Sequence, residues 1–211
     1  MSLSLADMLK LGKLRSPNQT TNIKLFTFDL QTLARSQIPT TAEFIEESDP
    51  IGTGGFRTAY RAKTKHPQYS GPKWVIKRYL EKAIQDIQNL GQTVEQHTRK
   101  VVQMHLLAKN FAFQLERRVS AEGVQDEFGR CLKYKNIYYG EIEGEGEKRF
   151  VTVEEFIDGR FRKYINNNGE VCLTGDGISE KAECLAHFSY EKSQEKLLLV
   201  DIQGCGYDMC D

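Results

Sequence analysis

An acidic residue directly follows the most apolar run of the chain. The run Leu197–Val200 precedes Asp201, and Gln203 follows two residues later. This pattern predicts a buried strand over Lys196–Gln203. A buried carboxylate costs free energy unless it meets a cation or takes part in chemistry. A second acid, Asp211, lies further along the chain, so the spacing favours a site that combines catalysis with metal binding.

A glycine cluster and a lysine could hold phosphate groups. Gly52, Gly54 and Gly55 stand between strand-like segments, where backbone N–H groups can approach phosphates closely. Lys77 follows within the next strand-like run and could reach inward to the same phosphates. Glycine clusters are more often plain turns, and strict alternation along a half-buried strand would place Lys77 on the solvent side. The residues alone leave both interpretations open.

The segments around these residues predict strands and three helical stretches. Asn168-Gly169 indicates a hairpin between Phe161–Tyr164 and Glu170–Leu173. We expect a late helix over Ser179–Ser193. The other expected strands are Asn22–Leu30, Phe56–Arg61, Lys73–Tyr79, Lys135–Ile142 and Arg149–Ile157. This order favours a mixed, mostly antiparallel α+β protein with two lobes.

The clearest helix begins at a capping box. Thr93 and Gln96 have the required spacing, and Gly91 is a plausible end for a preceding helix. Apolar residues at steps of three and four predict one buried stripe, formed by Val101, Met104, Ala108, Phe111 and Leu115. The segment from about residue 22 to 120 therefore has an apolar face of its own, and we expect that it could fold by itself.

Composition excludes several classes of protein. The chain has 29 basic and 29 acidic residues, which argues against a protein that coats nucleic acid. Its five cysteines show no secreted-type framework, there is no signal peptide, and no apolar run is long enough to span a bilayer. We expect a cytoplasmic protein without nucleic-acid or membrane partners.

Several blocks, in order, resemble the α-kinase family of atypical protein kinases, which includes the elongation factor two kinase, the myosin heavy chain kinases and the channel-kinases. The blocks are GTGGFR from Gly52, WVIKRY from Trp74, VEEFIDG from Val153, FRKYINNNG from Phe161, AHFSY from Ala186 and VDIQG from Val200. The resemblance begins near residue 45 and is closest to the elongation factor two kinase branch. The motifs of standard protein kinases are absent, because no His-Arg-Asp triplet occurs.

The resemblance implies a fold and an activity. The fold would be a two-lobed atypical protein-kinase-like one, with an N-lobe of curved antiparallel sheet plus a long helix and an incomplete C-lobe. Residues 1–21 would be a leader and linker, 22–153 the N-lobe and 154–211 a partial C-lobe. The activity would be transfer of the ATP γ-phosphate to serine or threonine in proteins, with acceptor residues in helical segments. The alternative is a nucleotide-binding but inactive module that serves regulation or interaction.

The resemblance also implies residue roles. Lys77 would bind the nucleotide phosphates, Glu154 would lie at the hinge beside the adenine, and Asp201 would be the catalytic acid or base. Gln203 would lie beside the metal or phosphates, and Asp211 would hold Mg²⁺. The remaining nucleotide-binding residues would be Gly52, Gly54, Gly55, Arg57, Lys163 and Asn167.

The sequence departs from the family pattern in three respects. His187 matches the histidine that binds a structural zinc, but the other ligands and a glycine-rich substrate loop would lie beyond Asp211. We therefore expect a C-terminally truncated domain, with structural Zn²⁺ only in a longer parent protein. Cys205 and Cys210 should be ordinary buried or partly exposed thiols. No glutamate on the long helix is clearly placed to pair with Lys77.

Overall fold

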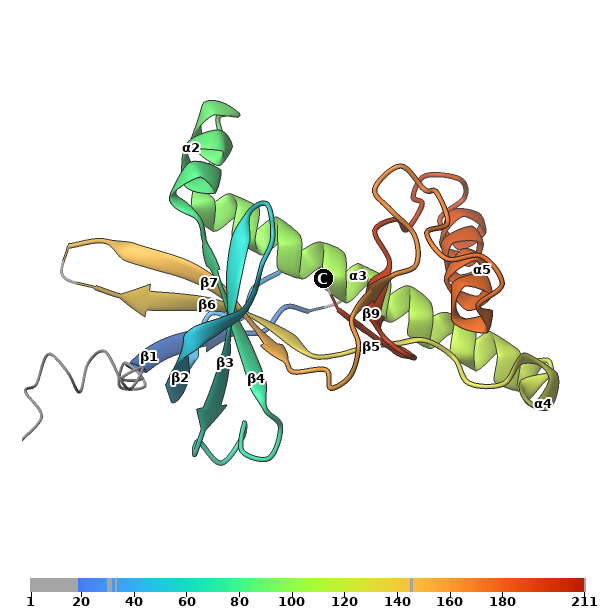
Figure 1. Cartoon of the computed structure of the whole chain (residues 1–211), viewed down its shortest axis with the longest axis horizontal. Helices are drawn as coiled ribbons and strands as arrows, with labels where there is room; N and C mark the ends of the chain where they lie inside the picture. Colours follow the sequence, from blue (N-terminus) through green and yellow to red (C-terminus); the bar gives the residue numbers. More distant parts are fainter. Residues whose placement is uncertain (1–18, 30–31, 33, 145, 211) are drawn as a thin grey trace, which may run out of the picture.

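Six antiparallel strands close into a barrel (Figure 1). The computed structural model describes residues 19–29, 32, 34–144 and 146–210. The order around the barrel is β1-β2-β3-β4-β7-β6, and pairing of β1 with β6 closes it. The strands are β1 (Gln19–Phe26), β2 (Thr40–Thr53), β3 (Arg57–Thr64), β4 (Trp74–Tyr79), β6 (Ile137–Glu143) and β7 (Lys148–Glu155). The barrel therefore combines strands from both sides of the long helix in sequence.

A second, smaller sheet has the order β5-β10-β9-β8. Its strands are β5 (Lys133–Tyr134), β10 (Asp208–Cys210), β9 (Gln203–Cys205) and β8 (Arg162–Lys163). The β5–β10 pair is parallel, whereas β9 pairs antiparallel with both β8 and β10. The chain connects this sheet to the barrel between β5 and β6 and again after β7.

Helix α3 (Val94–Ala121) runs along both sheets (Figure 1). It starts at the predicted capping box, in which Thr93 Oγ1 accepts from the Gln96 N–H and the Gln96 side chain accepts from the Thr93 N–H. Its buried Val102 packs with barrel residues, and its residues from Ala108 to Val119 join a cluster that includes α5. The other helices are α2 (Glu81–Asn89), α4 (Gln125–Phe128) and α5 (Gly177–Lys192). A single helix thus supports both sheets.

Most of the predicted elements are confirmed. The structure is α+β, and apart from β5–β10 its strand pairs are antiparallel. Gly91 follows α2 with a φ of 72°. The turn at Asn168-Gly169 forms, but the predicted hairpin strands do not pair: the turn is closed by a single bridge between Ile165 and Val171, and Arg162–Lys163 pairs with β9 instead. β1 begins at Gln19, slightly earlier than expected. Of the leader and linker expected over residues 1–21, residues 19–21 belong to β1, and residues 1–18 lie outside the described residues.

The predicted stripe on α3 is correct only in its carboxyl-terminal half. Ala108, Phe111 and Leu115 are buried, but the Met104 side chain is 47% exposed. Val102 and His105 are buried on the amino-terminal half instead. His105 faces inward because its Nε2 lies 2.8 Å from the Lys135 carbonyl oxygen and forms a hydrogen bond with it.

The predicted strand over Lys196–Gln203 is wrong. Only Gln203 belongs to a strand, and Leu197, Leu198 and Val200 are exposed. The Leu199 N–H donates to Ser189 Oγ on α5 at 2.9 Å, and the Asp201 N–H donates to the Asn166 carbonyl at 3.2 Å. The backbone of this segment therefore finds partners on a helix and on a loop rather than on a neighbouring strand.

Candidate functional site

A cavity of about 720 Å³ is lined by the barrel and by the second sheet. Its walls come from the loop between β2 and β3, from β4, from the end of β7 and from β9 and β10. The residues selected from the sequence that line it are Gly52, Gly54, Gly55, Arg57, Lys77, Glu154, Asp201 and Gln203. The fold therefore gathers distant parts of the chain around one space of a size suited to a small molecule.

The glycine-rich loop forms a tight turn between β2 and β3. The Gly54 N–H donates to the Arg57 carbonyl at 2.9 Å and closes the turn. A Cβ atom added at Gly52 or Gly55 would meet no atom within 4 Å, and neither residue has a positive φ. The conformation and packing of the loop do not themselves require glycine at these two positions, which leave bare backbone on the cavity wall.

A hydrogen-bonded network joins two cations to one buried carboxylate. Lys77 Nζ lies 2.8 Å from Glu154 Oε2, and the Glu154 side chain is only 3% exposed. Thr152 Oγ1 donates to Glu154 Oε1 at 2.8 Å and accepts from Arg57 Nη1 at 3.1 Å. Among the described residues, this network thus contains two cations and one carboxylate.

The carboxylate partner of Lys77 comes from β7 rather than from the long helix. The Lys77 side chain is 16% exposed, so the solvent-facing alternative is wrong. Thr152 lies opposite Lys77 in the β4–β7 pair and was missed in the sequence. The available signal was its spacing of two residues from Glu154, because residues i and i+2 of a strand share a face.

Asp201 lies in a loop and forms an ion pair. Its Oδ1 is 2.6 Å from Lys163 Nζ, and both side chains are 40% exposed. Lys163 pairs with Gln203 across β8 and β9, and its Nζ lies 3.5 Å from Asn167 Oδ1. The expectation of a buried acid at a strand end is therefore wrong, but the expected cation is present.

The loop that carries Asn166 holds Asp201 in place. Asp201 has a φ of 55°, a left-handed conformation that Asp and Asn tolerate better than most residues. Its N–H is bound by the Asn166 carbonyl, while Asn166 Oδ1 accepts from the N–H groups of Asn168 and Glu170, each at 2.9 Å. Asn166 is not among the residues predicted from the sequence, although an Asn two residues before an Asn-Gly turn was a signal for it.

The part of the cavity away from the glycine loop is lined by the segment after β7. Phe156, Ile157 and Gly159 lie on its wall. The Phe156 N–H donates to the Lys73 carbonyl at 2.8 Å, at the start of β4, whereas the glycine loop lies near the end of that strand. The Arg61 guanidinium lies 4.5 Å from the centre of the Phe156 ring, so this end combines aromatic and planar cationic surface.

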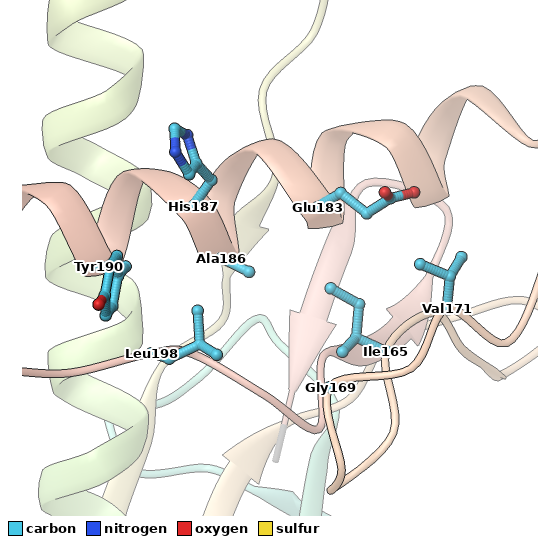
Figure 2. Close-up of a pocket in the computed structure, with 8 residues that line it drawn as sticks. All are labelled: Ile165, Gly169, Val171, Glu183, Ala186, His187, Tyr190 and Leu198. Atoms are coloured by element: carbon cyan, nitrogen blue, oxygen red, sulfur yellow. The ribbon is translucent and has the colours of Figure 1, made fainter. Parts of the chain in front are cut away.

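His187 lies apart from this cavity. It is on α5, beside a pocket of about 320 Å³ lined mainly by apolar residues. Figure 2 shows its ring pointing away from Ile165 and Leu198, and its Nε2 is 3.8 Å from Glu191 Oε1. Among the described residues, no three His, Cys, Asp or Glu side chains are arranged to hold a metal ion. Asp211 lies outside the described residues.

Two cysteines line the main cavity. Cys205 is buried, Cys210 is half-buried, and neither forms a disulfide among the described residues. Burial raises the pKa of the Cys205 thiol above its ordinary value, which disfavours the reactive thiolate. The expected burial of these thiols, complete at Cys205 and partial at Cys210, is confirmed. No described helix has the length and apolar character that a membrane span needs.

Comparisons with known proteins give consistent matches. The sequence model of the α-kinase family matches residues 52–211. Human eukaryotic elongation factor 2 kinase is 27% identical over 165 residues, which are 75% of this chain and 20% of that protein. Human transient receptor potential cation channel subfamily M member 6 is 35% identical over 63 residues, which are 30% of this chain and 3% of that protein. The chain thus spans a small part of these relatives.

Solved structures resemble the fold over most of the chain. A mutant catalytic domain of myosin heavy chain kinase A gives a TM-score of 0.73 at 18% identity, covering 93% of this chain and 83% of that one. The α-kinase domain of myosin-II heavy chain kinase A in complex with AMP-PNP gives 0.70 at 18% identity, covering 92% and 81%. At this identity the likeness concerns the fold.

Proposed function

Because this chain belongs to the α-kinase family, we propose that it is an ATP-dependent protein kinase that transfers the γ-phosphate to serine or threonine. The observation that carries the proposal is a single cavity that unites the glycine loop, the Lys77–Glu154 pair and Asp201. The kinase named among the relatives, and the AMP-PNP held by a structure of the same fold, support it. The substrate would be a protein, with acceptor residues in helical segments, and the location cytoplasmic.

The phosphates of ATP would lie against the glycine loop. Bare backbone at Gly52 and Gly55 allows close approach, and Lys77 and Arg57 supply positive charge beside it. Phosphoryl transfer needs little covalent help from the protein and depends mainly on positioning and charge stabilisation. Glu154 holds Lys77 at 2.8 Å and so fixes the direction in which the ammonium acts.

Asp201 would accept the proton of the attacking hydroxyl group. Asp201 lies on the cavity wall, and Lys163 Nζ lies 2.6 Å from its Oδ1. Lys163 and Asn167 do not line the cavity. Their proposed contribution is to orient Asp201 from behind, which differs from the direct nucleotide contact that the family resemblance implies.

The donor set on the cavity wall suits Mg²⁺. Gln203 carries a hard oxygen atom there, the ligand type that Mg²⁺ prefers, and Asp211 is the other ligand that the family resemblance implies. When bound, the ion would offset the negative charge of the phosphates. The described residues around His187 do not form a zinc site, so zinc has no part in this proposal.

The base of the nucleotide would lie toward the segment after β7. Glu154 is placed beside that segment, but its carboxylate is bound to Lys77. We therefore assign the base to the neighbourhood of Phe156 and Ile157, on the cavity wall. The division into an N-lobe over 22–153 and a partial C-lobe over 154–211 remains part of the proposal.

Replacing Lys77 by methionine tests nucleotide binding. Lys77→Met removes a cation from the phosphate end, so the affinity for a fluorescent ATP analogue should fall by more than about tenfold. Since the same change leaves Glu154 buried without its cation, the double variant Lys77→Met/Glu154→Gln serves as a folded comparison. Lys82→Met, at an exposed lysine on α2, is the matched control.

The outcomes separate the two candidate functions. Unchanged affinity in folded Lys77 variants, checked by circular dichroism, would refute the site. Tight ATP binding by the native chain without phosphate transfer to any helical threonine peptide would favour the inactive, nucleotide-binding module. Binding together with transfer would support the kinase.

A further inference from the structure

A relay of polar side chains connects α3 to the end of β7. Lys109 Nζ donates to Asn136 Oδ1, and Asn136 Nδ2 donates to Glu155 Oε1. The backbones of the last two residues are also joined, because the Glu155 N–H donates to the Asn136 carbonyl at 3.0 Å. None of these three side chains is used by the proposed phosphate site.

The relay suits an asparagine in its middle position. An ammonium group can only donate and a carboxylate can only accept hydrogen bonds, so the group between them must do both. The Asn136 amide accepts from Lys109 and donates to Glu155 with its two ends. The contacts fix which end of the amide carries the oxygen, and aspartate at position 136 would set two carboxylates against each other.

The relay ends at the segment that lines the cavity. Glu155 is the last residue of β7, and both it and Phe156 lie on the cavity wall. Successive strand residues point to opposite faces. Since the Glu154 carboxylate binds Lys77, the Glu155 carboxylate points the other way, toward Asn136. Glu155 therefore meets the cavity near its backbone.

Side chains from two successive turns of α3 form hydrogen bonds with residues 135 and 136, just before β6. His105 binds the Lys135 carbonyl, and Lys109 binds Asn136 one turn later. Lys109 is half-buried, and burial lowers the pKa of its ammonium group while the Glu155 carboxylate acts in the opposite direction. A partly desolvated lysine that is matched to a carboxylate through one amide implies a defined geometry rather than a solvated surface contact.

We propose that Lys109 and Asn136 are positioning residues for the base end of the bound nucleotide. They hold the backbone from Glu155 to Gly159 against α3, so that the base and ribose meet a fixed wall. This inference rests on the proposed binding of ATP in the cavity, and it adds residues that lie outside the cavity lining. The phosphate end, at the glycine loop, does not depend on the relay.

Two ligands distinguish the base end from the phosphate end. Lys109→Met keeps the length of the side chain but removes its donor, and it should weaken ATP binding by about tenfold. The affinity for inorganic tripolyphosphate, which has no base, should stay within about twofold. The conservative variant Lys109→Arg retains a charged donor and should restore most of the ATP affinity. Lys100→Met, at an exposed lysine of the same helix, is the matched control.

Kinetics and a second variant complete the test. At saturating ATP the turnover of Lys109→Met should be close to native while KM for ATP rises, because only ground-state binding is lost. If Lys109→Met is unstable, Glu155→Gln is the second variant to measure. It keeps the shape of the side chain but removes the charge, and it should also raise KM for ATP with a turnover close to native.

Four results would overturn the inference. Native ATP affinity in folded Lys109→Met and Glu155→Gln would show that the relay does not position the nucleotide. Equal losses for ATP and tripolyphosphate would show a general structural role. If the native chain binds tripolyphosphate and ATP equally well, the base makes no contact and the relay has nothing to position. If the native chain binds neither, the proposed function fails and the inference fails with it.

Discussion

At the scale of single residues, the site depends on ion pairs that cannot be predicted from the sequence. Lys77 and Asp201 were found from their types and neighbours, but their partners Glu154 and Lys163 come from other strands. Glu154 was predicted to lie at the hinge and Lys163 to bind the nucleotide. Their ion pairs were not predicted, because contacts between strands depend on the register of the sheet. The types of the charged residues could thus be predicted, whereas their contacts required the fold.

Replacing Asp201 by asparagine should separate catalysis from binding. Asparagine tolerates the positive φ of this position, so the change removes the base without straining the loop. In a chain that transfers phosphate, turnover should fall by about 100-fold to 10,000-fold, with ATP affinity nearly unchanged. Steady-state kinetics and nucleotide titration measure both quantities.

Asp86→Asn, at an exposed acid on α2, controls for the general effect of losing one negative charge. A near-native turnover in Asp201→Asn would show that another group accepts the proton.

At the scale of elements, predictions from short sequence motifs were correct where the residues of the motif bind only one another. The capping box of α3 and the Asn-Gly turn were correct because a few adjacent residues satisfy one another. The predicted strand over Lys196–Gln203 was wrong, and the Leu199 N–H in it donates to the hydroxyl of Ser189 on α5 instead of to a neighbouring strand. The inward position of His105 was missed because its hydrogen-bond partner is the carbonyl of Lys135.

Removing the cap of α3 should destabilise the protein. Thr93→Ala deletes the side chain that accepts from the Gln96 N–H and should lower the free energy of unfolding by about 1 kcal/mol. The midpoint of urea unfolding measures the change, and Gln92→Ala, at the exposed preceding residue, is the control. Equal midpoints for Thr93→Ala and Gln92→Ala would contradict a stabilising role for the cap.

At the scale of the whole molecule, the first half of the chain does not form the barrel alone. The segment 22–120 was expected to be able to fold by itself, but β6 and β7 follow α3 and supply two of the six barrel strands. Without β6 and β7, β1 and β4 each lose a neighbouring strand. The interior residues Ile23 and Ile76 then lose the apolar side chains of β6 and β7 from their core cluster. The hydrophobic pattern could not predict this arrangement, because it indicates which face of a strand is buried but not which strands are neighbours in the sheet.

A pair of fragments tests this dependence. A fragment over 19–121 should show no cooperative thermal unfolding, because its sheet is open and its apolar interior is wet. Extending it to 19–158 restores all six strands and should restore a cooperative transition with a strand signal in circular dichroism. Cooperative unfolding of the shorter fragment would show that four strands and α3 suffice.

Closure of the barrel also constrains how the chain folds during synthesis. The ion pair between Lys24 and Glu143, beside the β1–β6 seam, joins residues 119 positions apart. At typical rates of translation β1 would wait on the order of ten seconds for β6 to emerge. Throughout that interval one edge of β1 is unpaired, and an unpaired edge invites association with other chains. The nascent protein is thus most exposed to aggregation, and most dependent on chaperones, before β6 has left the ribosome.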